Sequence, residues 1–140
     1  MEKISRLSKF WLPPILWALI IYLFSSRPTV VVSEIYWPDF IFKKTVHLIE
    51  YGFFFVLLYR ALKGTVKKDL FHLAMLAFIL ATFYALSDEY HQTFIHGRTG
   101  TLRDIIIDSS GAGFAWWGIW KWLPKAPKRL KHWAKKLQIS

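Results

Sequence analysis

The sequence has 140 residues, which corresponds to one domain with one core. Hydrophobic residues make up 54% of the chain and aromatic residues 19%, while the formal net charge is +10. A soluble protein of this size cannot bury so much apolar surface, so the composition indicates a membrane protein. The chain contains no cysteine, which excludes disulfides, thiol nucleophiles and cysteine ligands for metals.

Four apolar segments predict the membrane helices. They span residues 11–24, 46–59, 70–86 and 105–123. At about 14 to 19 residues, they lie at or below the length of roughly 17 to 25 residues that a spanning helix needs. We therefore predict an all-α membrane protein, in which residues 1–123 form a bundle of four transmembrane helices and residues 124–140 a separate tail.

The first helix and the loop after it carry three further predictions. Pro13 and Pro14 favour a helix that begins at that point, because proline is best tolerated in the first turn. Basic residues precede the first apolar segment, as in a signal peptide, but no A-x-A-like cleavage site follows, so we expect a retained helix. Residues 25–44 predict a long irregular loop, in which residues 30–32 form a short strand or lie against the bilayer surface.

Lysine and arginine are distributed unevenly between the two ends of the predicted helices. Fourteen of the 19 lie in the N-terminal residues, the second loop and the C-terminal part of the chain from Lys121 onward. The remaining five lie in the first and third loops and are Arg27, Lys43, Lys44, Arg98 and Arg103. By the positive-inside rule, both termini are cytoplasmic, and loops one and three face the extracytoplasmic side of the cell membrane.

The basic tail, residues 124–140, has a helical pattern of its own. Leu130, Trp133, Ala134 and Leu137 recur at i, i+3, i+4 and i+7, with basic residues around them. We expect this amphipathic helix on the anionic cytoplasmic leaflet, where each basic residue contributes about 1 kcal/mol. RNA and calmodulin-like proteins are alternative partners, but the charges follow the membrane topology. The expected partners are therefore membrane lipids and not nucleic acid.

Polar side chains interrupt the second, third and fourth segments on the predicted outer side. A central Asp, Lys or Arg costs roughly 2.5 to 3.5 kcal/mol in a membrane helix, so such groups persist mainly where they are buried in the bundle or functional. Helical spacing places them on shared faces, and His47 and Glu50 are expected at the outer end of their helix. The candidate ligand-binding residues on these helices are His47, Glu50, Tyr51, Asp88, Glu89, Gln92, Asp104 and Asp108.

The segment HGRTG, residues 96–100, adds Arg98 as a ninth candidate. Its two glycines predict a tight turn that presents the guanidinium to the carboxylates. The guanidinium then either forms salt bridges with them or clamps a phosphate or carboxylate by two-point contact. The following TLRD is a capping box, so Asp104 has a structural alternative as a helix cap. Small residues from Gly111 to Ala115 allow a neighbouring helix to approach closely.

Three motifs, KKTVHLIEY, SDEYHQTFIHGRTGTLRD and IIIDSSGAGFAWWG, resemble the VanZ-like family of small membrane proteins. The matching positions are His47, Tyr51, Asp88, Glu89, Gln92, Arg98, Asp104, Gly111 and Gly118. His96 stands where the family often has proline. The resemblance implies a multi-pass protein of the bacterial cell envelope, in a family named for an association with resistance to the glycopeptide teicoplanin. It supplies no reaction.

Three functions are compatible with these residues. In the first, an outer-leaflet pocket binds an anionic lipid-linked envelope component or a glycopeptide, with cations such as Arg98 holding the anion. In the second, the histidines and carboxylates hold a divalent metal, or act as general acid and base, in an enzyme that acts on a lipid-linked envelope precursor. No motif such as HExxH is present, so no metal site or cofactor is assigned. The third is proton-coupled transport, which four short helices support poorly unless the protein oligomerises.

Overall fold

The computed structural model describes residues 2–28, 36–98 and 100–139. These residues form helices and loops and contain no strand, so the predicted all-α class is confirmed. The elements in chain order are α1 (Glu2–Ser25), α2 (Tyr36–Thr65), α3 (Leu70–Gln92), α4 (Leu102–Trp117), a π-helical turn η1 (Gly118–Trp122), a 3₁₀ turn η2 (Leu123–Lys125) and α5 (Lys128–Lys136).

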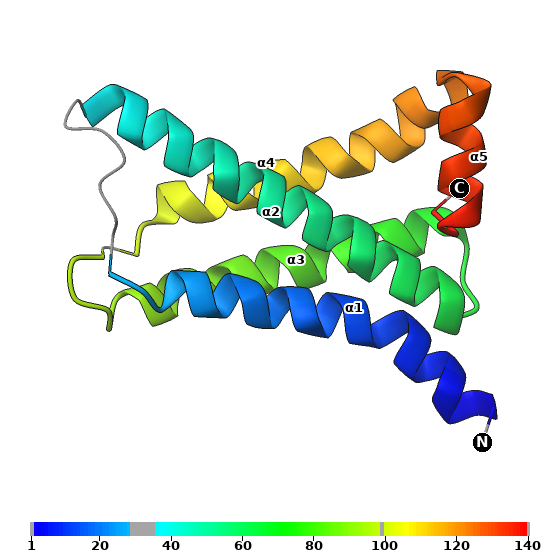
Figure 1. The fold of residues 1–140 in the computed structure, drawn as a ribbon, viewed down its shortest axis with the longest axis horizontal. Coiled ribbons are helices and arrows are strands. Elements are labelled where there is room, and N and C mark those ends of the chain that lie inside the picture. Colours follow the sequence, from blue (N-terminus) through cyan, green and yellow to red (C-terminus); the bar gives the residue numbers. More distant parts are fainter. Residues whose placement is uncertain (1, 29–35, 99, 140) are drawn as a thin grey trace.

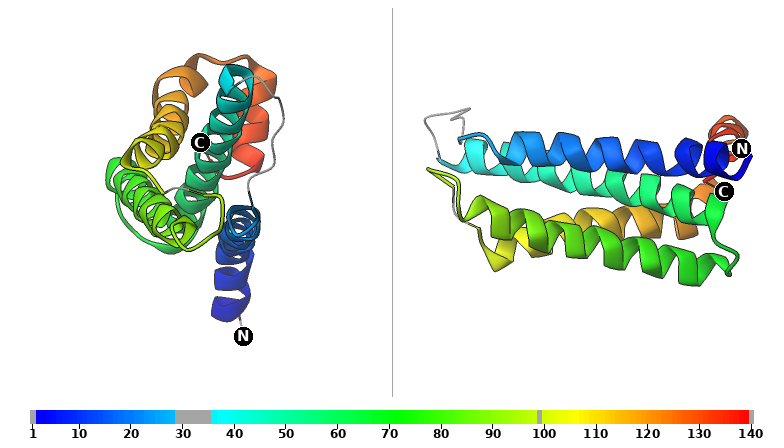
Figure 2. Two further views of the ribbon diagram at one scale, coloured as in Figure 1. Left: turned by 90° about the vertical axis from the view of Figure 1, so that its left-hand side faces the viewer. Right: turned by 90° about the horizontal axis from the view of Figure 1, so that it is seen from below.

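The four long helices form two layers, with α1 beside α2 and α3 beside α4 (Figures 1 and 2). Helix α2 packs against each of the other three, and α3 also packs against α4. Both termini and α5 lie at one end of the bundle, which we call the termini end (Figure 1). At the other end, the loop end, α1 and α3 finish and α2 and α4 begin.

Close packing of α2 against α4 depends on glycine. A side chain on Gly111 would overlap the carbonyl group of Leu48, and a Cβ on Gly52 would lie 3.1 Å from the Gly111 oxygen. The two backbones therefore meet at a distance that only small residues allow. This confirms the close approach predicted for the fourth helix. Tyr51 and Phe55, both fully buried, fill the core beside this contact.

Three helices in the described part of the chain are long and apolar enough to cross a membrane. They span Ile4–Ser25, Trp37–Thr65 and Leu70–Gln92. Many large apolar side chains on these helices remain exposed, including Ile15, Ile79 and Phe83. A surface of this kind indicates a membrane-associated protein. Helix α4 has 16 residues and is shorter than the three spans, so the fourth spanning helix stays a prediction.

The start predicted for the first helix is wrong. Helix α1 begins at Glu2 and carries Pro13 and Pro14 in its interior. An interior proline lacks the N–H that would bond the carbonyl four residues earlier, and it bends a helix without necessarily ending it. The ribbon of α1 bends in its N-terminal half (Figure 1). Phe10 and Ile21 are both buried, so packing against the bundle continues on both sides of the prolines.

The irregular loop predicted over residues 25–44 is also wrong in its second half, because α2 begins at Tyr36. Pro38 falls in the first turn, where the missing N–H removes no intrahelical bond. Asp39 places a negative charge near the helix N-terminus and forms an ion pair with Lys43 one turn later, at 2.6 Å. These local interactions favour a helix that starts well before the apolar residues do.

The longer helix changes the position of two candidate residues along α2. His47 and Glu50 were expected at the outer end of their helix, but α2 has 30 residues and places them near its middle. The prediction of their position along the helix was wrong because the apolar pattern does not include the polar turns that come before it. The strand or bilayer contact predicted for residues 30–32 lies outside the described residues.

The basic tail forms helix α5, as its amphipathic pattern predicts. Ala134 is buried against Leu123 and Ala126, while Leu130 and Trp133 are exposed on the outside of the molecule. The apolar stripe is therefore only partly used inside the fold. Its remaining aromatic and aliphatic side chains are available to a bilayer surface.

Candidate functional site

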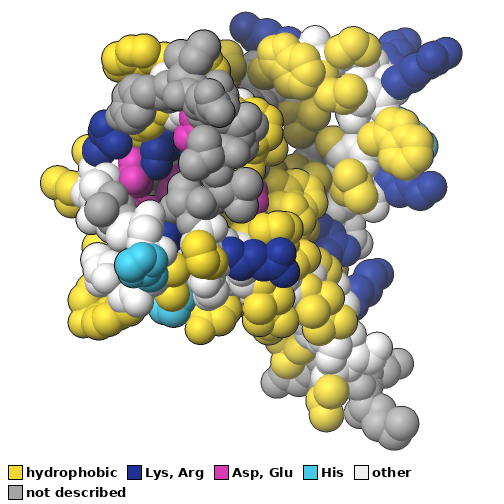
Figure 3. All heavy atoms as spheres, turned by 60° about the vertical axis from the view of Figure 1, so that its left-hand side comes forward, with side chains coloured by type: hydrophobic (Ala, Val, Ile, Leu, Met, Phe, Trp, Pro, Cys, Tyr) yellow, Lys and Arg dark blue, Asp and Glu magenta, His cyan; other side chains and the backbone are white. Residues whose placement is uncertain are grey.

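Acidic and basic side chains gather in a recess at the loop end of the bundle (Figure 3). A pocket of about 670 Å³ lies here, with walls from α1, α2, the start of α4 and the turn between α3 and α4. Five of the nine predicted site residues line it. They are His47, Glu50, Gln92, Arg98 and Asp104. The other four, Tyr51, Asp88, Glu89 and Asp108, are buried in the adjoining protein and do not line the pocket.

Two ion pairs join α2 to α4 beside the pocket. Lys44 Nζ lies 2.8 Å from an oxygen of Asp104, and His47 Nδ1 lies 3.3 Å from an oxygen of Asp108. Asp108 is almost completely buried, with 1% of its surface exposed. Because the residues of each pair stand about one turn from those of the other, they form successive contacts along the same helix interface.

Helix α3 contributes a buried hydrogen-bond network at its C-terminal end. Gln92 Nε2 donates to Asp88 Oδ2 at 3.0 Å and to Glu89 Oε1 at 3.2 Å. Glu89 Oε2 accepts a hydrogen bond from the backbone N–H of Thr101 at 3.0 Å. Gly100 lies so close that a Cβ there would overlap the Glu89 carbonyl. The network therefore fixes the point at which α4 begins.

The predicted capping box is half formed. Thr101 Oγ1 accepts the N–H of Asp104 at 3.3 Å, which confirms Thr101 as the N-cap of α4. The reciprocal part is wrong, because the N–H of Thr101 bonds to Glu89. The Asp104 carboxylate instead faces Lys44, at 2.8 Å, and Arg103, at 3.6 Å. Asp104 therefore acts as an ion-pair partner on the pocket wall.

Arg98 binds backbone carbonyls, which neither sequence alternative anticipated. Its Nε donates to the Arg27 oxygen at 2.8 Å and one terminal nitrogen donates to the Phe24 oxygen at 3.0 Å. The other terminal nitrogen lies 3.4 Å from Gln92 Oε1. These bonds satisfy carbonyls at the C-terminus of α1, which have no partner within the helix. Arg98 thus joins α1 to the end of α3.

Several buried polar atoms beneath the pocket have no hydrogen-bond partner within the described residues. They are the Tyr51 hydroxyl, Asp88 Oδ1, both carboxylate oxygens of Asp108 and Ser25 Oγ. Tyr51 has no exposed surface at all. Buried polar groups in proteins normally have hydrogen-bond partners, so this cluster makes the core beneath the pocket more polar than the apolar core around Phe55 and Leu58.

Sequence reasoning missed the contribution of α1 to the pocket. Ile21, Phe24 and Ser25 line it from the end of that helix, and Phe40 and Phe42 from the start of α2. The first helix has no charged residue in its apolar part, so no sequence signal marked its end as part of a site. Only the arrangement of the helices in space brings these residues together.

His91, one of the predicted acid-base groups, lies outside the pocket lining. Its Nε2 is 3.1 Å from Ser26 Oγ, and its ring packs on Tyr22 at 4.8 Å between centroids. Across residues 2–28, 36–98 and 100–139, no group of three or more His, Asp or Glu side chains is placed to hold a metal ion. The acid-base chemistry that remains at the pocket centres on His47 and Glu50.

Comparisons with known proteins place these residues in a family. Searches of the curated proteins and of the solved structures found no match. A model of the VanZ/LLP1 family matches residues 10–123, which include the last two thirds of α1, all of α2 to α4, and all nine predicted site residues. The match covers most of the chain and ends before the basic tail, and it confirms the resemblance seen in the three motifs. The chain therefore belongs to the VanZ/LLP1 family.

Proposed function

We propose that the chain is a multi-pass protein of the bacterial cell membrane with four spanning helices and both termini in the cytoplasm. The fourth span would be α4 together with η1 and η2, which continue it without a break and bring the helical length to 24 residues. At about 1.5 Å per residue, this length exceeds a hydrocarbon core of about 30 Å. The excess of basic residues at the termini end supports the orientation.

The topology has a direct test, because the natural chain contains no cysteine. Single-cysteine variants His96→Cys in the third loop and Lys67→Cys in the second would be treated with a membrane-impermeant maleimide. We expect His96→Cys to react in intact cells and Lys67→Cys only after permeabilisation. The opposite pattern, or reaction of both in intact cells, would contradict the proposed orientation.

We further propose that the pocket at the loop end binds the phosphate head of an anionic lipid-linked envelope component. One observation carries this proposal: cationic and apolar side chains share one pocket. Its described lining holds five Lys or Arg and three Asp or Glu side chains, so the formal charge is positive. Those side chains are Arg27, Lys43, Lys44, Arg98, Arg103, Asp39, Glu50 and Asp104.

The apolar wall supports a lipid rather than a soluble anion. Phe24 on α1 and Phe42 on α2 line the pocket and are each more than half exposed. A hydrocarbon or isoprenoid chain could therefore lie between α1 and α2 while its phosphate meets the cations. Burial of each CH₂ group would contribute about 0.8 kcal/mol, which favours lipid-linked ligands over short anions.

Binding of a polyisoprenyl phosphate to purified protein in detergent tests this proposal. The double variant Lys43→Gln/Arg103→Gln removes two pocket cations and leaves the Arg98 bonds to α1 intact. We expect its dissociation constant to rise roughly 10- to 30-fold, since each lost charge-assisted hydrogen bond weakens binding by about 1 kcal/mol.

The matched control is Lys67→Gln/Lys68→Gln, which removes the same charge from the exposed second loop. We expect this control to bind as the unmodified protein does. Equal losses in both double variants would show attraction by net charge alone. No binding by the unmodified protein would refute the proposed ligand class.

Influence on teicoplanin susceptibility is a further proposal for the same site, supported by the family and by the expected envelope ligand. It predicts that expression of the unmodified chain changes the inhibitory concentration of teicoplanin in a susceptible host, and that the Lys43→Gln/Arg103→Gln variant does not. An identical effect of both proteins would show that any influence on teicoplanin susceptibility does not depend on the pocket.

An enzyme acting on a lipid-linked phosphate is the second candidate function, and the His47–Asp108 contact favours it. A buried carboxylate beside Nδ1 orients an imidazole so that Nε2 can accept a proton from an attacking water. His47 is the member of this pair that lines the pocket. The test is release of inorganic phosphate from polyisoprenyl diphosphate. We expect this release to be lost in His47→Gln and retained in His91→Gln. Absence of turnover by the unmodified protein would leave binding as the function.

A further inference from the structure

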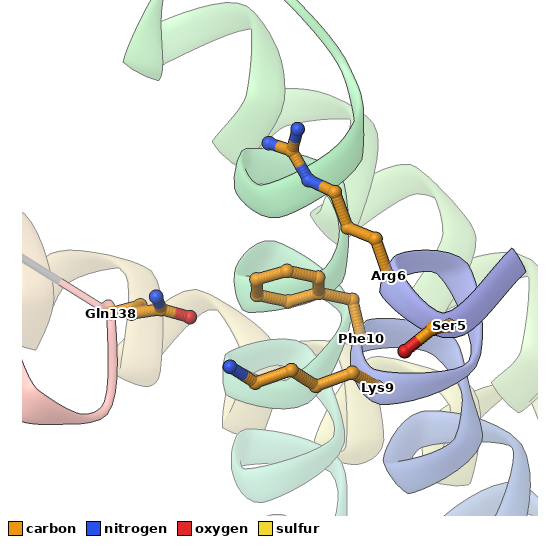
Figure 4. Close-up of a pocket in the computed structure, with 5 residues that line it drawn as sticks. All are labelled: Ser5, Arg6, Lys9, Phe10 and Gln138. Carbon is orange, nitrogen blue, oxygen red and sulfur yellow. The ribbon is translucent and has the colours of Figure 1, made fainter. Parts of the chain in front are cut away.

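A second pocket lies at the termini end, far from the loop-end site. It has a volume of about 420 Å³ and is lined by Ser5, Arg6, Lys9, Phe10 and Gln138 (Figure 4). The first turns of α1 and the chain that follows α5 form its walls. Segments from opposite ends of the sequence therefore build it together, and it exists only when the tail is docked on the bundle.

The lining residues supply positive charge and hydrogen-bond donors without a carboxylate among them. Arg6 Nε donates to the Gly64 carbonyl at 3.1 Å, which fixes the side chain at the end of α2. Its two terminal nitrogens make no hydrogen bond to any described residue. Lys9 forms no ion pair with a described carboxylate, and its ammonium lies 5.8 Å from the centroid of the Phe10 ring.

The tail completes the pocket with an amide. In Figure 4 the ends of Lys9 and Gln138 point toward one another on one side of the Phe10 ring, and Arg6 lies on the other side. Gln138 has a positive φ of 62°, which a side-chain-bearing residue adopts only at a cost. Arg60 supports this geometry, because its Nε donates to the Leu137 oxygen at 3.0 Å and its guanidinium lies 5.1 Å from the Phe10 ring.

We propose that this pocket binds the phosphate of an anionic membrane lipid in the leaflet on the side of the termini. A guanidinium, an ammonium and an amide offer N–H donors for phosphate oxygens, and a guanidinium can bind two of them at once. Basic pockets beside membrane helices on the cytoplasmic side are suited to anionic headgroups. The exposed Trp133 on the adjoining helix α5 provides apolar contact with the same bilayer surface.

The bound lipid would hold the tail to the bundle. Arg6 and Lys9 belong to α1, Gly64 to the end of α2, and Gln138 to the tail, so one phosphate would bridge elements that the chain connects only over long distances. This role differs from that of the loop-end pocket, which lies at the opposite end. The two proposals therefore succeed or fail independently.

Titration of purified protein in neutral detergent with short-chain phosphatidylglycerol tests the inference, with the lipid-dependent rise in melting temperature as the readout. The variant Arg6→Gln/Lys9→Gln should bind roughly 30-fold more weakly, which corresponds to about 1 kcal/mol for each cation. The matched control Lys128→Gln/Lys131→Gln removes the same charge from exposed positions on α5. It should keep the affinity of the unmodified protein within about threefold.

The single variant Lys9→Gln distinguishes loss of binding from misfolding, because it keeps the hydrogen bond from Arg6 to Gly64. It should lose about fivefold in affinity and melt normally without lipid. Equal losses in the pocket variant and the control would overturn the inference in favour of general attraction by a basic surface. An equal response to inorganic phosphate would show a site for free phosphate, and an equal response to short-chain phosphatidylcholine would show a site without charge selectivity. Either result would refute an anionic lipid as the ligand.

Discussion

Both ends of the bundle are rich in cationic side chains, but the groups that these side chains contact differ between the ends. At the loop end, Lys44 pairs with a buried carboxylate of Asp104 and Lys43 pairs with Asp39. At the termini end, Arg6 and Arg60 donate to backbone carbonyls, as Arg98 does at the loop end, but no described carboxylate forms an ion pair with either of them. Charges that are paired inside the fold are held in fixed positions, which suits selection of a specific ligand. Charges without carboxylate partners keep N–H donors for an anion from outside the fold, which suits the lipid phosphate proposed for the termini end.

The largest expected effect is on stability, and it comes from comparing an alanine placed at a close helix contact with one placed where there is room for it. Gly111→Ala should lower the free energy of unfolding by about 1 to 3 kcal/mol, because the new Cβ would overlap the carbonyl of Leu48 and push α2 from α4. Gly118→Ala, toward the termini end, is the matched control, since a Cβ there meets nothing within 4 Å. Unfolding in mixed micelles of a mild detergent and dodecyl sulfate measures both. Equal stability of the two variants would contradict the packing described here.

Acid-to-amide substitutions compare a buried and an exposed carboxylate. Glu89→Gln should destabilise the fold by about 2 kcal/mol, because a glutamine side chain cannot accept from both Gln92 and the Thr101 N–H. Asp69→Asn at the exposed N-cap of α3 should leave stability near neutral pH almost unchanged, because asparagine caps helices equally well. The same unfolding measurement applies. A loss at Asp69 as large as that at Glu89 would remove the distinction between the two ends.

Replacement of two arginines, one at each end of the bundle, should have a smaller effect on stability. Arg98→Lys should cost about 1 kcal/mol, because an ammonium cannot reproduce the planar fork that contacts Phe24, Arg27 and Gln92. Arg60→Lys loses one such hydrogen bond to the tail and should cost roughly half as much. Limited proteolysis of each variant would locate the loosened segment, with cleavage after α1 expected in the first and in the tail in the second. Cleavage at the same place in both would argue against separate roles.

The smallest expected effect is a dependence on pH at the termini end. The backbone N–H of His72, and then its side chain, hold the pKa of Asp69 below its ordinary value of 3.8. Since the folded pKa is the lower one, the charged carboxylate stabilises the fold above about pH 4 and loses this contribution as the pH falls through the folded pKa. The difference in melting temperature between unmodified protein and Asp69→Asn should therefore shrink in acid. A difference that stays constant from pH 7 to about pH 3 would contradict this.

Helix existence and the convergence of polar groups could be predicted from the sequence, because both follow from local periodicity. The spacing of His47 and of Asp108 placed each on an inward face, and the structure joins them at 3.3 Å. The residues at which helices begin and end were harder to predict from the sequence. Pro13 lies inside α1 because packing on both sides outweighs one missing hydrogen bond.

The partners of Arg98 could not be predicted, because they belong to the tertiary arrangement. The sequence places this arginine near several carboxylates, and a salt bridge is then the natural expectation. In the fold, the end of α1 arrives beside it and offers two carbonyl oxygens, that of Phe24, which also accepts the Arg27 N–H, and that of Arg27. Unsatisfied carbonyls at a helix end carry no sequence signature of their own. The same reason explains why the apolar wall contributed by α1 was missed.

The length of α2 links the site to the thickness of the membrane. At about 1.5 Å per residue, its 30 residues extend about 45 Å, well beyond a hydrocarbon core of about 30 Å. Because Asp39, Lys43 and Lys44 make the first turns of α2 polar, part of this extra length would reach the headgroup layer, and tilting of the helix would accommodate the rest. Because Glu50 lies near the middle of this helix, a change of tilt would move the polar pocket relative to the headgroup layer. For the phosphate ligand that we propose, the acyl-chain length of the surrounding lipids would then set how deeply the phosphate must descend to reach the pocket.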